Sequence, residues 1–174
     1  AGGIGLSIIQ AAKSVSAWPI IAVDIFEKRL ELAKQIGATH AINGLENDPK
    51  VLIKSILQNQ ELDVFIDNTG IPNVIEKGYS IIKSDGRLIL VGVPKRDKNI
   101  NIHSLPLHFG KLISGSHGGE SIPNKDIPRY IRHIKKNNID LDSIITKRFD
   151  LKNINEAIQS MQDGETAGRV LIKF

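Results

Sequence analysis

The chain has 174 residues, of which 41% are hydrophobic, and a formal net charge of +4. This length and apolar content favour a folded globular protein, and the absence of cysteine leaves no disulfide framework and no thiolate metal site in these residues. No apolar run is long enough for a membrane span, and the basic residues are dispersed among few aromatic ones, so we expect neither a membrane protein nor a nucleic-acid-binding protein but a cytoplasmic one.

Helices and strands alternate through the first half of the sequence. Apolar residues at helical spacing predict a helix over 3–16, and the β-branched run IIAVD predicts a buried parallel strand over 20–24. Further segments of the same two kinds follow in order: a helix over 27–37, a strand over 38–43, a helix over 49–58, a strand over 63–70, a helix over 72–83 and a strand over 87–93. We expect Asp85-Gly86 to end the helix over 72–83. Such alternation is the signature of a parallel βαβ sheet.

The alternation weakens after Pro94. KLISGSHGGE (111–120) predicts a strand that runs into a glycine-rich loop, and an amphipathic helix is expected over 126–137. Asp150 is the expected N-cap of a last helix, and RVLIKF (169–174) predicts a closing strand. The whole pattern predicts the α/β class, with a doubly wound Rossmann sheet of parallel strands.

The opening glycines and a strand-ending aspartate predict a dinucleotide site. Gly2, Gly3 and Gly5 precede a helix, where free backbone N–H groups favour a diphosphate. Asp24 lies 19 residues beyond Gly5, at the end of a predicted strand, where its carboxylate can accept hydrogen bonds from both hydroxyls of an adenosine ribose. The same carboxylate would repel a 2′-phosphate, and no arginine sits beside it to reverse that preference. The pattern therefore predicts NAD rather than NADP.

These stretches in combination resemble the medium-chain zinc-containing alcohol and polyol dehydrogenases. The resemblance rests on AGGIGLSIIQAAK, IIAVDIFEKRLELAKQIGATHAIN, DVFIDNTG, GRLILVGVP and GETAGRVLIKF. It implies a dinucleotide-binding domain over 1–118, truncated at its start, and C-terminal helices and a strand over 119–174 that return toward a substrate domain. In the family, one more glycine and a valine-rich strand precede the turn, so we expect a sheet that lacks its first strand and a chain that is a piece of a longer polypeptide.

The resemblance also implies roles for single residues. Gly2, Gly3 and Gly5 match the pyrophosphate turn, and Asp24 matches the ribose acid. The remaining cofactor-binding matches are Arg29 over the adenosine ribose, Val91, Gly92 and Val93 at the strand end that meets the nicotinamide carboxamide, Ser116 in the next loop against the nicotinamide, and Arg169 at the pyrophosphate. Residues 67–70 (DNTG) match the loop that faces the adenine side.

No catalytic and no metal-ligating residue is identified within the chain. His103, His108 and His117 have spacings of 5 and 9, which fit no short zinc pattern, and no nucleophile motif of the G-x-S-x-G kind occurs. The resemblance places the zinc ligands before the glycine turn. Zinc is therefore expected only in a missing N-terminal domain, and we expect this fragment alone to be inactive.

The implied function is hydride transfer between a primary or secondary alcohol, or a polyol, and NAD. The resemblance further implies a homodimer or homotetramer of the full-length protein, paired along a strand at about 111–117. Two alternatives stay open. One is a zinc-free quinone or enoyl reductase of the same superfamily, whose usual NADPH is opposed by Asp24; the other is a non-catalytic NAD-sensing module, which the match beyond residue 120 disfavours.

Overall fold

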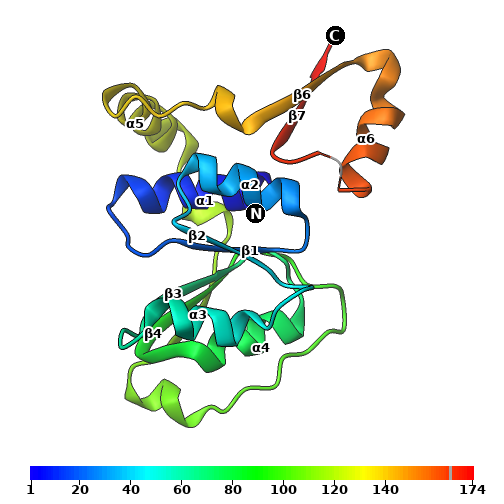
Figure 1. The fold of residues 1–174 in the computed structure, drawn as a ribbon. Coiled ribbons are helices and arrows are strands. Elements are labelled where there is room, and N and C mark those ends of the chain that lie inside the picture. Colours follow the sequence, from blue (N-terminus) through cyan, green and yellow to red (C-terminus); the bar gives the residue numbers. More distant parts are fainter. Residues whose placement is uncertain (165) are drawn as a thin grey trace. The chain divides into compact units, whose positions relative to one another are not determined.

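The computed structural model describes residues 1–164 and 166–174, and these residues form two compact units. The first unit comprises residues 1–52 together with 127–174, and the second comprises residues 53–126. Both are built from parallel strands and helices, so the predicted α/β class is confirmed (Figure 1). Within these described ranges, no helix is both long enough and apolar enough to cross a membrane.

The first unit begins with two helix–strand pairs that surround one core. In chain order its elements are α1 (Gly3–Ser14), β1 (Ile21–Asp24), α2 (Glu27–Ile36) and β2 (His40–Asn43). β1 pairs with β2 in parallel, with Ile21 opposite His40 and Asp24 opposite Asn43. Leu6 of α1 and Ala33 of α2 are both fully buried, because each helix turns one apolar stripe toward the shared core.

The C-terminal part of the first unit adds a second pair of parallel strands. It contains most of α5 (Pro123–Lys136), together with β6 (Ile145–Asp150), α6 (Ile154–Gln162) and β7 (Arg169–Lys173), and short 3₁₀ turns at Asp142–Ile144 and Leu151–Asn153. β6 and β7 are neighbours, with Phe149 opposite Ile172. Ile144, just before β6, joins the core that α1 and α2 form, so the two ends of the chain share one apolar cluster.

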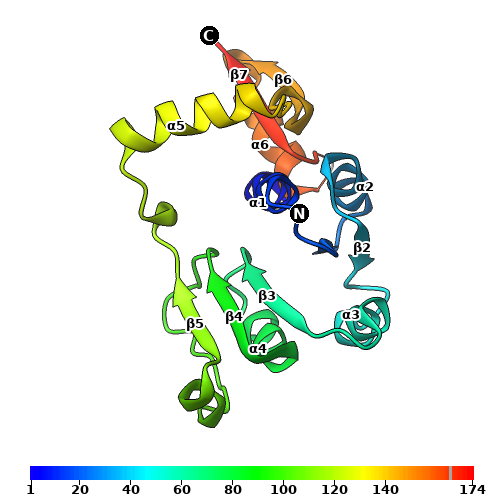
Figure 2. The ribbon, with the colours of Figure 1, turned by 90° about the vertical axis from the view of Figure 1, so that its left-hand side faces the viewer.

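The second unit is a three-stranded parallel sheet with a helix packed against it (Figure 2). Its elements are β3 (Leu62–Asp67), α4 (Pro72–Ile81), β4 (Ile82–Leu90), a 3₁₀ turn (Leu105–Phe109) and β5 (Leu112–Gly115). The strands lie in the order β3-β4-β5. α3 (Pro49–Leu57) is the helix that precedes β3 along the chain.

Lys111 closes the C-terminal end of α4. Its Nζ donates hydrogen bonds to the carbonyl oxygens of Tyr79 and Ile82, at 3.0 and 2.9 Å, and lies 4.7 Å from the centre of the Tyr79 ring. α4 has no basic residue in its own last turn, so a lysine from outside the helix supplies the cation that its C-terminus favours. Burial lowers the pKa of Lys111.

Most predicted elements are found within a few residues of their expected bounds, and four differ in a way that has a physical reason. The helix expected to reach residue 83 ends at Ile81, and β4 runs straight through Asp85-Gly86, which form an irregularity in its pairing with β3 rather than a helix end. α5 starts at Pro123, because proline is well placed at a helix start.

The other two differences lie before the last helix. Strand β6 was not predicted, since its sequence ITKRFD alternates between half-buried and exposed residues and carries two basic residues. Asp150 does not cap α6: a 3₁₀ turn separates them, and no side-chain hydrogen bond caps that turn.

Candidate functional site

The start of α1 presents an uncompensated helix N-terminus. Gly2 is the N-cap residue in an extended conformation, with φ −70° and ψ −172°, and α1 begins at Gly3. The first backbone hydrogen bond of the turn runs from the N–H of Leu6 to the carbonyl of Gly2, at 2.9 Å. The first turn carries no acidic side chain, so its N–H groups keep their attraction for an anion.

Arg169 lies directly against this turn. A methyl group added at Gly3 would stand 2.6 Å from Cδ and 2.8 Å from Cζ of Arg169, whereas one added at Gly2 would meet nothing within 4 Å. Only glycine at position 3 therefore lets the arginine, at the start of β7, approach the helix so closely. Two predicted residues from opposite ends of the chain meet here, and together they offer a cation and free N–H groups to one anion.

Asp24 ends β1 and turns its carboxylate back on the following residues. Its Oδ1 accepts hydrogen bonds from the backbone N–H groups of Ile25 and Phe26, at 2.8 and 3.1 Å. Its Oδ2 lies 2.6 Å from the backbone nitrogen of Ala1. The start of the glycine turn and the predicted ribose acid therefore lie side by side.

Burial and hydrogen bonding act in opposite directions on the carboxyl group of Asp24. Burial raises its pKa, whereas the hydrogen bonds donated by the backbone N–H groups of Phe26 and Ile25 lower it. The ionised carboxylate is an acceptor only, as a partner of two ribose hydroxyls must be.

Arg29 stands beside this carboxylate, which corrects the expectation that no arginine does. Its Nη1 lies 3.9 Å from Oδ1 of Asp24. The five-residue separation hid the approach, because α2 begins between the two residues and its first turn folds Arg29 back toward the end of β1. The acid that is predicted to reject a 2′-phosphate therefore has a cation next to it.

In the second unit, the loop after β3 packs against the end of β4. The N–H groups of Val91 and Gly92 both donate to the carbonyl oxygen of Asp67, at 2.7 and 3.0 Å. A methyl group at Gly92 would lie 2.5 Å from the backbone nitrogen of Thr69, so glycine is needed there for the two loops to touch. Val93 is 88% exposed.

The carboxylate of Asp67 organises that loop from inside. It is 1% exposed, its Oδ1 accepts hydrogen bonds from the N–H and the hydroxyl of Thr69, and its Oδ2 accepts one from the N–H of Gly70. Gly70 has φ +68°, a conformation that glycine adopts without strain. Asp67 therefore fixes the backbone and is not open to a ligand.

Ser116 follows β5 and continues the hydrogen bonding of the sheet. Its N–H donates to the carbonyl of Leu90 at 2.9 Å, and its Oγ accepts from the N–H of Gly119 at 3.1 Å. Its hydroxyl shapes the glycine-rich loop in the structure.

The predicted site residues thus form two groups, one in each unit. The first unit brings together those expected at the diphosphate and the ribose, which are Gly2, Gly3, Gly5, Asp24, Arg29 and Arg169. The second brings together those expected at the nicotinamide, which are Val91, Gly92, Val93 and Ser116.

Two residues that lie next to the first group, Phe26 and Gly164, were not predicted as site residues. The Phe26 ring lies under the Arg29 guanidinium, and Gly164 packs against the same ring. Aromatic and basic residues three positions apart at a helix start are a signal that could have indicated the first contact.

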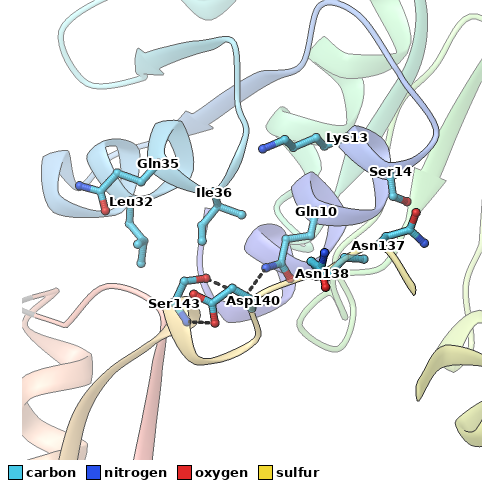
Figure 3. A pocket seen from close by; sticks show the side chains of 11 residues that line it. Gln10, Lys13, Ser14, Leu32, Gln35, Ile36, Asn137, Asn138, Asp140 and Ser143 are labelled. Carbon is cyan, nitrogen blue, oxygen red and sulfur yellow. Dashed lines mark hydrogen bonds between the residues drawn. The ribbon is translucent and has the colours of Figure 1, made fainter. Parts of the chain in front are cut away.

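A polar cavity of about 530 Å³ lies at the other end of the same helices (Figure 3). Lys13 and Gln35 line it from the last turns of α1 and α2, and the amide of Gln10 donates to the carbonyl of Asp140 at 3.0 Å. α1 has 12 residues, so its two ends are about 18 Å apart. This cavity is therefore separate from the glycine turn.

No group of three or more His, Cys, Asp or Glu side chains that could hold a metal ion occurs in residues 1–164 and 166–174. The three histidines singled out in the sequence lie on exposed parts of the second unit.

Comparison with known proteins assigns a family to this arrangement. Residues 3–136 match the family described as zinc-binding dehydrogenase. Alcohol dehydrogenase 6 of Peromyscus maniculatus is 33% identical over 98% of the chain and 46% of its own length. The crystal structure of benzyl alcohol dehydrogenase from Acinetobacter calcoaceticus matches 99% of the chain and 48% of its own, with a TM-score of 0.89 and 34% identity.

The match is not confined to one kind of substrate. L-threonine 3-dehydrogenase of Bacillus subtilis is 28% identical over 98% of the chain and 49% of its own length. The chain spans about half the length of the relatives that it matches.

Proposed function

The chain belongs to the zinc-binding dehydrogenase family, and from this premise we propose that it is the NAD-binding part of an alcohol or polyol dehydrogenase. Two contacts in one compact unit carry the proposal: Arg169 packs on Gly3, and Asp24 lies 2.6 Å from the nitrogen of Ala1, at the start of the same glycine turn. A bound nicotinamide would accept or release the hydride of the alcohol. The residues of this chain bind and orient the cofactor.

The start of α1 is the proposed seat of the diphosphate. The open space over Gly2 and the free N–H groups of the first turn fit phosphate oxygens, and the guanidinium of Arg169 adds a planar cation beside them. A side chain at Gly3 would push Arg169 away, so the glycine and the arginine fit the diphosphate only in combination.

Asp24 is the proposed partner of the adenosine ribose. A carboxylate that accepts hydrogen bonds from two hydroxyls contributes about 1.5–3 kcal/mol for each bond. The same charge repels a 2′-phosphate, so we propose that NAD is bound more tightly than NADP.

The nicotinamide end is assigned to the second unit. We propose that the backbone of Val91–Val93 meets the carboxamide and that Ser116 lies in the next loop against the ring. The packing of Gly92 on the loop after β3 supports this role, since it fixes the backbone of the strand end.

The remaining proposals concern the domains, the zinc, the subunits and the substrate of the whole protein. We propose that residues 1–118 form the dinucleotide-binding domain and 119–174 the return toward a substrate domain, with the zinc held by residues outside this chain. Subunits would pair along β5, whose Leu112 is 46% exposed, as a homodimer or homotetramer in the cytoplasm. A small-molecule alcohol is the proposed substrate.

Binding titrations with NAD and NADP test the proposal. For the intact protein, Asp24→Ala should weaken NAD about tenfold or more, and NADP much less, because the lost hydrogen bonds serve the ribose hydroxyls. Asp150→Ala is the matched control, since Asp150 also ends a strand of the first unit but is exposed. Unchanged selectivity in Asp24→Ala would remove the cofactor assignment.

A further inference from the structure

The guanidinium of Arg29 rests on an aromatic ring. Its Cζ lies 4.5 Å from the centre of the Phe26 ring. Phe26 is the N-cap residue of α2 and precedes Arg29 by three positions, so both side chains lie on one face of the first turn. Stacking uses the flat face of the guanidinium and leaves its N–H donors pointing outward in the plane.

The Phe26 ring is itself held in place from two sides. Its backbone N–H donates to Oδ1 of Asp24 at 3.1 Å, which ties the residue to the end of β1. Gly164, with φ +71°, packs its backbone on the ring: a methyl group added there would lie 2.7 Å from Cζ of Phe26. The surface beneath Arg29 is therefore fixed by the segment that follows α6 as well as by α2.

Arg29 keeps its hydrogen-bonding capacity. The 3.9 Å between its Nη1 and Oδ1 of Asp24 is longer than a hydrogen bond, and that oxygen already accepts from Ile25 and Phe26. Within the described ranges, the Arg29 guanidinium donates no hydrogen bond. The positive charge of Arg29 therefore lies beside Asp24, and its hydrogen-bond donors remain available to a ligand.

We propose that Phe26 is a positioning residue that lets this site tolerate a 2′-phosphate on adenosine, by holding the Arg29 guanidinium beside Asp24. The inference rests on the proposed role of Asp24 at the adenosine ribose. Asp24 alone would repel the phosphate dianion, and a fixed cation next to it offsets part of that repulsion. The preference for an unphosphorylated ribose is therefore smaller than the carboxylate alone would impose.

Two small ligands, AMP and adenosine 2′,5′-bisphosphate, separate this role from general packing. Both are titrated calorimetrically into the intact protein and into Phe26→Leu, Phe26→Tyr and Arg29→Gln. Phe26→Leu should weaken the bisphosphate about two- to fivefold relative to AMP, because the cation–π contact is lost. Arg29→Gln should weaken it about tenfold, and Phe26→Tyr should retain the original ratio. Phe149→Leu and Arg148→Gln, in β6 of the same unit, are the matched controls.

The outcomes distinguish this inference from the proposed function. If AMP does not bind, or binds equally well to Asp24→Ala, the ribose site itself is wrong and the role of Phe26 falls with it. If AMP binds through Asp24 but Phe26→Leu leaves the ratio of the two affinities unchanged, or weakens both ligands in parallel, Phe26 only packs and the inference is overturned.

Discussion

Each unit has an aspartate at the end of a parallel strand and a basic residue, and the two units differ in the burial of the aspartate and in the hydrogen bonds of the basic residue. In the second unit, Asp67 is 1% exposed, and Lys111 donates to two backbone carbonyl groups. In the first unit, Asp24 is half-buried, and Arg29 lies 3.9 Å from its carboxylate, too far for a hydrogen bond. Both carboxylates accept hydrogen bonds from the backbone N–H groups that follow them. Position in the fold and backbone hydrogen bonds therefore do not separate a structural acid from a binding acid, whereas burial does.

The largest effect that this contrast predicts is on stability, at Asp67. Replacing Asp67 by alanine leaves the N–H groups of Thr69 and Gly70 without their acceptor, and Gly70 is buried. We expect the free energy of unfolding to fall by about 3 kcal/mol, measured by urea denaturation. Asp24→Ala should cost about 1 kcal/mol or less. Equal losses at the two positions would abolish the contrast.

Gly92 should be the next most sensitive position. Gly92→Ala places a methyl group 2.5 Å from backbone atoms of Asn68 and Thr69, which cannot move without disturbing the loop. A loss of about 2 kcal/mol is expected in the same denaturation experiment. Gly115→Ala is the matched control, because nothing lies within 4 Å of its added methyl group. A stable Gly92→Ala protein would show that the two loops are not tightly joined.

Lys111 and Arg29 should differ in their contribution to stability in the same direction as the two aspartates, but by a smaller free energy. Lys111→Met removes two hydrogen bonds at the end of α4 but retains much of the apolar chain, so we expect a loss of about 1 kcal/mol in stability. Arg29→Met should change stability by less than about 0.5 kcal/mol. The reverse order, from thermal or urea unfolding, would mean that Arg29 is the structural cation.

The fold was largely predictable because its signals are local. Glycine at positions 2, 3 and 37 and the apolar periods of α1 and α2 place elements that the structure confirms. Strand β6 was not predicted, because a strand with alternating exposure and two basic residues gives a weak signal. The prediction that Asp85-Gly86 ends a helix was wrong, because a turn signal inside a strand can equally mark an irregularity of strand pairing.

The candidate site was less predictable, since it depends on contacts between distant segments. The approach of Arg169 to Gly3 joins the two ends of the chain, and the packing of Gly164 on Phe26 joins the C-terminal segment to α2. Family resemblance supplied Arg169, but nothing local to Phe26 indicates that Gly164 covers its ring. The start of α2 was predicted from the sequence, but the approach of Arg29 to Asp24 was not, because it depends on how the first turn of the helix folds back toward the end of β1.

The most direct test of the central claim is the structure of the intact protein in complex with NAD. The diphosphate is predicted to lie over Gly2 and Gly3 beside Arg169. A carboxylate oxygen of Asp24 is predicted to stand about 2.5–2.7 Å from a hydroxyl of the adenosine ribose. NAD bound elsewhere, or an Asp24 side chain that points away from the ribose, would contradict the account.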